Sequence, residues 1–162
     1  MEALAVFFCL AITLHNIEEA IWLPQWSKQG LKFQKAVTPN EFHFAMLVIT
    51  ALAYLSAFFF IFFPQSNFAK WLFVGFLGAM IINAVFPHLL ATIIMKKYAP
   101  GLVTGLLLNI PINCFIIQRM FEAHLIGWTE LLFSTIIVGL SLLALIPFLF
   151  KLGKMFTLNS KT

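Results

Sequence analysis

Residues 3–23 read ALAVFFCLAITLHNIEEAIWL, an apolar stretch interrupted by one imidazole and two carboxylates. About 20 mainly apolar residues match the thickness of a bilayer, so this stretch predicts a transmembrane helix. At about 100° per residue, Glu18 lies about 60° to one side of His15 and Glu19 about 40° to the other, so all three share one face. Ionisable groups inside a membrane are costly, and two such carboxylates need a cation or a proton beside them. We therefore expect a functional site on this face.

The rest of the chain has the same apolar character. Of its 162 residues, 62% are hydrophobic and 10% are charged, which is typical of a polytopic membrane protein. We expect a single all-α domain with five transmembrane spans at residues 3–23, 40–63, 71–95, 101–119 and 126–150. Its lysines are scattered between the spans, which favours lipid headgroups and argues against a nucleic-acid partner.

The basic residues predict an orientation. With five spans, the first connection, the third connection and the C-terminus lie on one side of the membrane. That side carries eight of the ten Lys and Arg residues, whereas only Lys70 and Arg119 lie on the other. The positive-inside rule then predicts an outside N-terminus and a cytoplasmic C-terminus, and we expect a bacterial-type plasma membrane.

Two more histidines fall at the depth of the first-span group. His43 lies near the start of the second predicted span and His88 near the end of the third, both in the cytoplasmic half. We expect His15, Glu19, His43 and His88 to bind a divalent metal ion, with Glu18 as the general base. Alternatively, His43 and His88 form hydrogen bonds between helices, as buried polar residues of membrane bundles often do.

The second and third spans offer further candidates. Residues 38–41 read TPNE, the pattern of a capping box, so Glu41 is expected to cap the helix, with a place in the site as the alternative. Pro87 cannot donate a backbone hydrogen bond, so it should free the carbonyl of Asn83 and kink the third span. Such a kink could turn His88 inward.

The fourth span begins with Lys96-Lys97-Tyr98-Ala99-Pro100-Gly101. Small and polar residues share one narrow helical arc with Tyr98, namely Gly101, Gly105, Asn109 and Asn113. The two glycines predict close helix packing. Alternatively, free N–H groups at this helix start, with Lys96 and Lys97 nearby, bind an anionic headgroup or phosphate, and the asparagines extend a polar track into the bundle. Tyr98 is a candidate catalytic residue.

These motifs together resemble the HXXEE-domain family of small membrane proteins. That family is defined by an H-x-x-E-E motif, further histidines and a Y-x-P-G element, which match residues 15–19, the later histidines and residues 98–101. The resemblance covers nearly the whole chain, from the first span to the fourth, and it supports the same site residues.

Histidines and glutamates in this number suit Zn²⁺ best, with iron or manganese as alternatives. We expect a metal-dependent hydrolase that acts on a lipid or isoprenoid-type substrate from the cytoplasmic leaflet. Two bridged metal ions would instead suit oxidation of a lipid chain. A metal-free isomerase or cyclase could use a glutamate as the acid. A transporter is the remaining alternative, for which a homodimer could supply the symmetry that the sequence lacks.

Overall fold

In the computed structural model, which describes residues 2–29 and 36–159, every regular element is a helix. Within these residues, five stretches are long and apolar enough to cross a membrane: Ala3–Trp26, Pro39–Phe62, Asn67–Met95, Leu102–Glu122 and Trp128–Phe156. The predicted all-α architecture with five spans is therefore confirmed.

The third and fourth spans are each built from three consecutive helical segments. The elements are α1 (Glu2–Trp26), η1 (Ser27–Gln29), α2 (Pro39–Phe62), α3 (Asn67–Asn83), η2 (Ala84–Leu89), α4 (Leu90–Met95), α5 (Leu102–Thr104), η3 (Gly105–Asn109), α6 (Ile110–Glu122) and α7 (Trp128–Asn159). The last helix continues nine residues beyond the expected end at residue 150. Lysine is a good helix former and its long side chain can reach the headgroups, so Lys151 and Lys154 do not end the helix.

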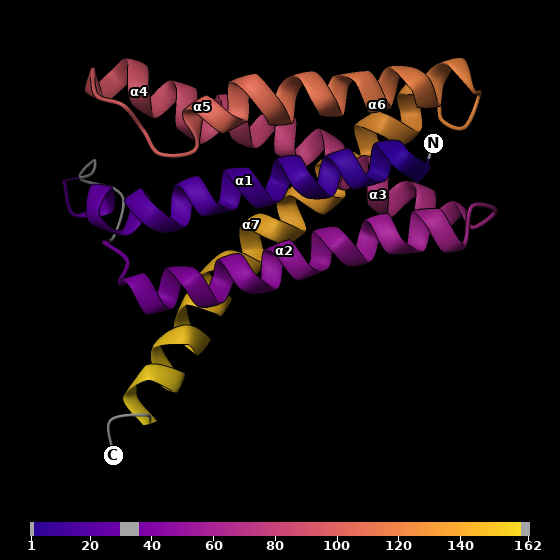
Figure 1. The fold of residues 1–162 in the computed structure, drawn as a ribbon. Helices are drawn as coiled ribbons and strands as arrows, with labels where there is room; N and C mark the ends of the chain where they lie inside the picture. Colours follow the sequence, from indigo (N-terminus) through magenta and orange to yellow (C-terminus); the bar gives the residue numbers. More distant parts are fainter. Residues whose placement is uncertain (1, 30–35, 160–162) are drawn as a thin grey trace.

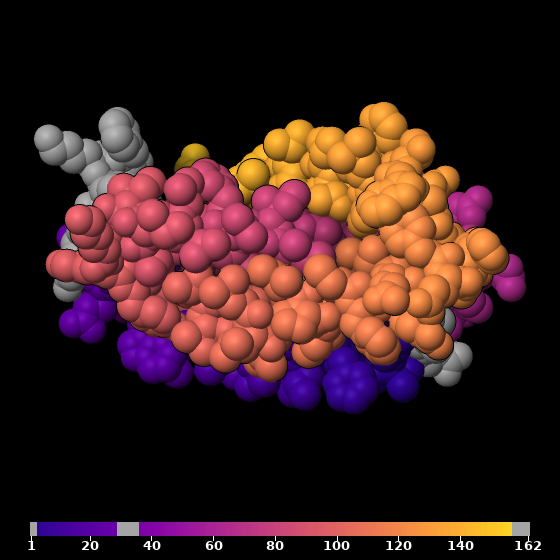
Figure 2. Space-filling model, turned by 90° about the horizontal axis from the view of Figure 1, so that it is seen from above, coloured from indigo at the N-terminus to yellow at the C-terminus, as the bar shows by residue number. Residues whose placement is uncertain are grey.

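The helices pack together as one bundle, in which α7 contacts both α2 and α3 (Figure 1). In that view α1 lies between α2 and the segment α5–α6, while α7 crosses the bundle obliquely at the back. The end of α1, the start of α2, the connection from α4 to α5 and the end of α7 all lie at one end of the bundle. Seen from above, residues of η2 to α6 form the middle of the surface, with α7 on one side and α1 on the other (Figure 2). The third and fourth spans therefore cover α1 on the side of its polar face.

Close packing in the middle of the bundle is made by aromatic rings and glycines. The Phe73 ring on α3 contacts Phe8 of α1 edge-on at 5.3 Å and stacks on Phe60 of α2 at 4.6 Å between centroids. A Cβ on Gly78 would overlap the Thr135 side chain of α7. Since lipid tails are as apolar as the side chains, such close contacts between helices stabilise a membrane bundle.

Two π-helical segments, η2 and η3, interrupt the third and fourth spans and contact each other. Pro87 lies inside η2, where Phe86 has non-helical dihedral angles, and Pro111 follows η3 by two residues. Proline cannot donate to the carbonyl four residues earlier, so each interruption has a local cause. The kink expected at Pro87 is present, and His88 beside it is buried.

The capping box at the start of α2 is also confirmed. The backbone N–H of Glu41 donates to the Thr38 hydroxyl at 3.4 Å, and the backbone N–H of Thr38 donates to the Glu41 carboxylate at 2.9 Å. Glu41 thereby stabilises a helix end, as the sequence predicts.

Candidate metal centre

Three buried side chains from two spans converge at one point. His15 and Glu19 lie one turn apart on α1, and His88 reaches them from η2. One possible ligand atom from each residue lies within 4.8 Å of the other two. Glu19 Oε1 is 2.9 Å from His88 Nε2 and 3.7 Å from His15 Nε2, and the imidazole rings meet edge to face.

These separations suit a metal ion. With bonds of about 2.0–2.1 Å, two ligands of a tetrahedral ion lie about 3.3 Å apart, and the two distances from Glu19 lie on either side of that value. The Asn83 side-chain nitrogen is 3.2 Å from both imidazole Nε2 atoms, so its amide borders the same space. Turning this amide by 180° would present an oxygen there instead. Two histidines, one glutamate and an adjacent amide thus form a possible donor set.

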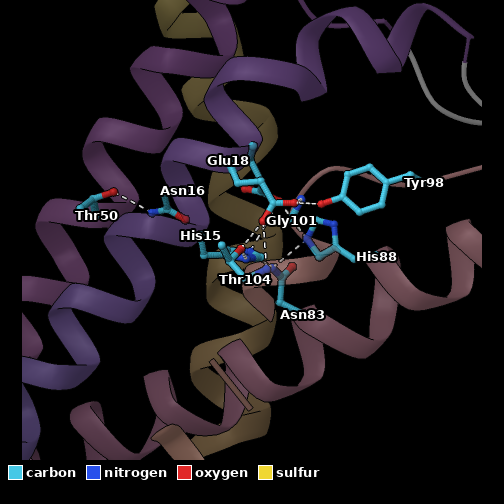
Figure 3. A network of polar contacts seen from close by, with 10 residues as sticks. His15, Asn16, Glu18, Thr50, Asn83, His88, Tyr98, Gly101 and Thr104 are labelled. Carbon is cyan, nitrogen blue, oxygen red and sulfur yellow. Dashed lines mark hydrogen bonds and ion pairs between the residues drawn. The ribbon is translucent and has the colours of Figure 1, made fainter. Parts of the chain in front are cut away.

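A chain of hydrogen bonds orients His15 (Figure 3). The Thr104 hydroxyl donates to Glu18 Oε2 at 2.6 Å, because an ionised carboxylate can only accept. Its oxygen is then free to accept a hydrogen bond from His15 Nδ1, 3.0 Å away. His15 therefore carries its proton on Nδ1, and the lone pair on Nε2 faces Glu19 and His88. A metal-binding histidine needs this arrangement.

Glu18 binds the start of the fourth span. Its Oε1 accepts hydrogen bonds from the Tyr98 hydroxyl and from the Gly101 N–H at 2.7 Å. Its Oε2 accepts from the N–H and the hydroxyl of Thr104, at 3.0 and 2.6 Å. The N–H groups expected to bind an external anion thus donate to a carboxylate of α1. With four donors on two oxygens, Glu18 has little capacity left to act as a base.

Gly101 lets the loop approach the two imidazoles. Its φ of +92° lies in the left-handed region that favours glycine. A Cβ at this position would lie 2.7 Å from His88 Cε1 and 3.0 Å from His15 Cε1, closer than ordinary van der Waals contact. Any other residue at position 101 would therefore push against both rings.

Tyr98 is hydrogen-bonded to Glu18 and lines a neighbouring cavity. Partial burial, and then its hydrogen bond to Glu18, raise the pKa of Tyr98 to about 12, so the phenol stays protonated at neutral pH. A cavity of about 350 Å³ adjoins it, lined by Trp22, Gln25, Trp26, Tyr98 and Pro100. The cavity lies at the end of α1, which provides three of its five lining residues.

Other predicted candidates lie elsewhere. His43 is exposed on α2, and its Nε2 is 2.9 Å from the Ala20 carbonyl oxygen, so the structure does not bring it to the other two histidines. Lys96 and Lys97 are exposed in the loop before α5. Asn109 and Asn113 are fully buried in the fourth span.

Thr104 was missed by sequence reasoning. It links Glu18 to His15 through its hydroxyl, as described above. The sequence offered one indication: Thr104 is the only residue with a hydroxyl group between positions 102 and 108, and it follows Gly101 by three positions. Spacing alone does not show that the loop lies against α1.

Comparison with known proteins assigns the chain to a family. Residues 6–116 match the model of the HXXEE family, described as proteins of unknown function with an HXXEE motif. The chain belongs to the HXXEE family. In this HXXEE protein, the motif residues are His15, Glu18 and Glu19, and all three are buried. The chain is also 67% identical over 153 residues to the uncharacterized protein YrkK of Bacillus subtilis, covering 94% of this chain and 97% of YrkK. No solved structure matches the chain.

Proposed function

We propose that this HXXEE protein is a metal-dependent membrane enzyme that hydrolyses a lipid or isoprenoid-type substrate at one divalent ion held by His15, Glu19 and His88. The convergence of these three ligand atoms carries the proposal. Two histidines and one glutamate are the ligands of known catalytic zinc sites, which keep one position open for water or substrate. All three residues come from one chain, so a homodimer is compatible with the proposal and is not required by it.

Each nearby side chain then has a distinct role. A divalent ion supplies Lewis acidity and lowers the pKa of the water that it binds, so a separate strong base is not essential. Thr104 fixes the His15 tautomer, and Asn83 directs its amide at both imidazoles. In place of the general-base role expected from the sequence, we assign Glu18 to hold the loop of Tyr98 and Gly101 over the ligands.

The cavity beside Tyr98 suits entry of an amphiphilic substrate. Two tryptophans, a tyrosine and a proline line it together with one amide side chain, Gln25. Tryptophan and tyrosine are typical of the membrane interface, where an apolar chain and a polar head meet. By the distribution of basic residues, we assign this end of the bundle to the cytoplasmic leaflet.

Oxidation of a lipid chain at a single iron is the second candidate. The same donor set, two histidines and one carboxylate, is the facial triad of non-haem iron oxygenases. The convergence of His15, Glu19 and His88 therefore supports this candidate as well.

Metal analysis of the purified protein tests the proposal. We expect one zinc ion per chain, lost in H15A, E19Q and H88A and retained in H43A. H43A is the informative control, because His43 lies at a similar depth and is exposed. One iron per chain with oxygen consumption would favour the second candidate. Metal-free protein, or loss of metal in H43A to the same extent, would refute the site as drawn.

A further inference from the structure

The fourth span carries two buried carboxamides that the metal centre does not use. Asn109 and Asn113 lie four residues apart, at the end of η3 and in α6, and both are fully buried. Among the described residues, neither polar atom of the Asn109 side chain has a hydrogen-bond partner, and neither has Asn113 Oδ1. Asn113 Nδ2 makes only a long bond, 3.4 Å, to the Leu77 carbonyl. Buried amide groups in a membrane bundle normally have partners.

These carboxamides lie between the metal site and the middle of α3. A Cβ on Gly105 would be 3.0 Å from Ala84 Cβ and 3.7 Å from His15 Cε1, so this glycine adjoins the metal site. Asn113, eight residues further along, is bonded to Leu77 of α3. Asn109 stands between them on the same helical face, with about 5–6 Å between side chains one turn apart. Gly105, Asn109 and Asn113 therefore form a row that extends from His15 into the bundle.

The chemistry of the unpartnered atoms selects their ligand. Asn109 has a free acceptor, Oδ1, and two free donors on Nδ2. A cation would satisfy only the oxygen, and an anion only the nitrogen. A water molecule or a hydroxyl group can donate to one atom and accept from the other, and buried waters typically bind such groups.

We propose that Asn109 and Asn113 hold internal water between α3 and the fourth span. The helical face of Gly105, Asn109 and Asn113 connects this water to His15, and the water is the one that hydrolysis consumes. Its role in supply rests on the function proposed above, whereas the water site itself does not. An apolar substrate in the cavity beside Tyr98 and water from the opposite side would then reach the ligands separately.

Met80 offers a built-in probe of this water. It lies on α3 three residues after Leu77 and four before Ala84, the first residue of η2, so helix geometry leads us to expect its side chain beside Asn109. Its side chain is buried and packs in the hydrophobic core. X-ray radiolysis turns bound water into hydroxyl radicals that oxidise adjacent methionine sulfur. Purified protein irradiated in ¹⁸O-labelled water should therefore carry ¹⁸O at Met80, as measured by mass spectrometry.

Three variants make the test specific. N109L keeps the size of the side chain and should lose the Met80 label, whereas N109S retains a donor and an acceptor and should keep it. N16L is the matched control, because the buried Asn16 amide already donates to Thr50 at 2.7 Å, and its label should equal that of the wild type. Equal elution volumes of the variants on gel filtration show that they are folded.

Several outcomes of the labelling experiment would contradict the proposal. An unlabelled Met80 in the wild type, or a label that persists in N109L, would overturn the proposal. An unlabelled Met80 together with a hydroxylated lipid that co-purifies with the wild type but not with N109L would assign the site to a lipid hydroxyl instead of water. Labelling requires neither metal nor substrate. Labelled Met80 in a metal-free protein would therefore refute the metal centre alone, and unlabelled Met80 in a zinc-loaded protein would refute the water site alone.

Discussion

Replacement of Thr104 by valine should weaken metal binding although Thr104 is not a ligand. The change keeps the shape of the side chain and removes the hydroxyl that donates to Glu18 Oε2 and accepts from His15 Nδ1. His15 then loses the partner that holds its proton on Nδ1. The N–H of residue 104 still donates to Glu18, so the helix start remains in place.

The expected size of the effect follows from these bonds. Removing a hydrogen-bond partner of a metal-binding histidine typically costs about 10–100-fold in metal affinity. That range corresponds to about 1.4–2.7 kcal/mol. We expect T104V to raise the dissociation constant for zinc by this factor, while T104S, which keeps the hydroxyl, should bind zinc as the wild type does.

A titration of metal-free protein with zinc against a competing chelator measures this constant. T13V is the matched control, because the Thr13 hydroxyl also makes two hydrogen bonds, to the Cys9 carbonyl and the Tyr54 hydroxyl, away from the ligands. Wild-type affinity in T104V would refute the proposed orientation of His15. An equal loss in T13V would show that general destabilisation explains the effect.

Further predictions concern the loop, its tyrosine and the topology. G101A should abolish zinc binding in the same titration, because a positive φ costs about 1–3 kcal/mol and the new Cβ overlaps both imidazoles; normal binding would contradict the close approach. With the chain's other tyrosine replaced by phenylalanine, tyrosinate absorbance should appear with a midpoint near pH 12, and E18Q should lower the midpoint. Because this pKa is raised on folding, the stability that the neutral Tyr98 phenol contributes is complete below about pH 10 and is lost as the pH rises through about 12. Cysteines placed at Lys28 and Lys151 should resist a membrane-impermeant reagent added outside, and labelling of either would reverse the orientation.

The five spans and the polar face of the first helix were predictable from the sequence. Hydrophobic length is a local property, and the angle between His15, Glu18 and Glu19 follows from helix geometry alone. The capping box of Glu41 and the interruption at Pro87 are local as well, because each depends on residues within one turn. Contacts between helices could not be predicted in this way, because they depend on how the helices pack. His43 and His88 were both predicted as ligands because they lie at a similar predicted depth. Of the two, His88 contacts Glu19, with 2.9 Å between Nε2 and Oε1.

The sequence by itself predicted a five-span bundle with carboxylates and imidazoles at one depth. Only the tertiary structure decided which of them meet and what each carboxylate does. Depth in the membrane is set by position along a helix, but direction is set by how the helix packs against its neighbours. For that reason two adjacent glutamates have different partners. Glu18 accepts hydrogen bonds from Gly101 and Thr104, while Glu19 faces the two histidines.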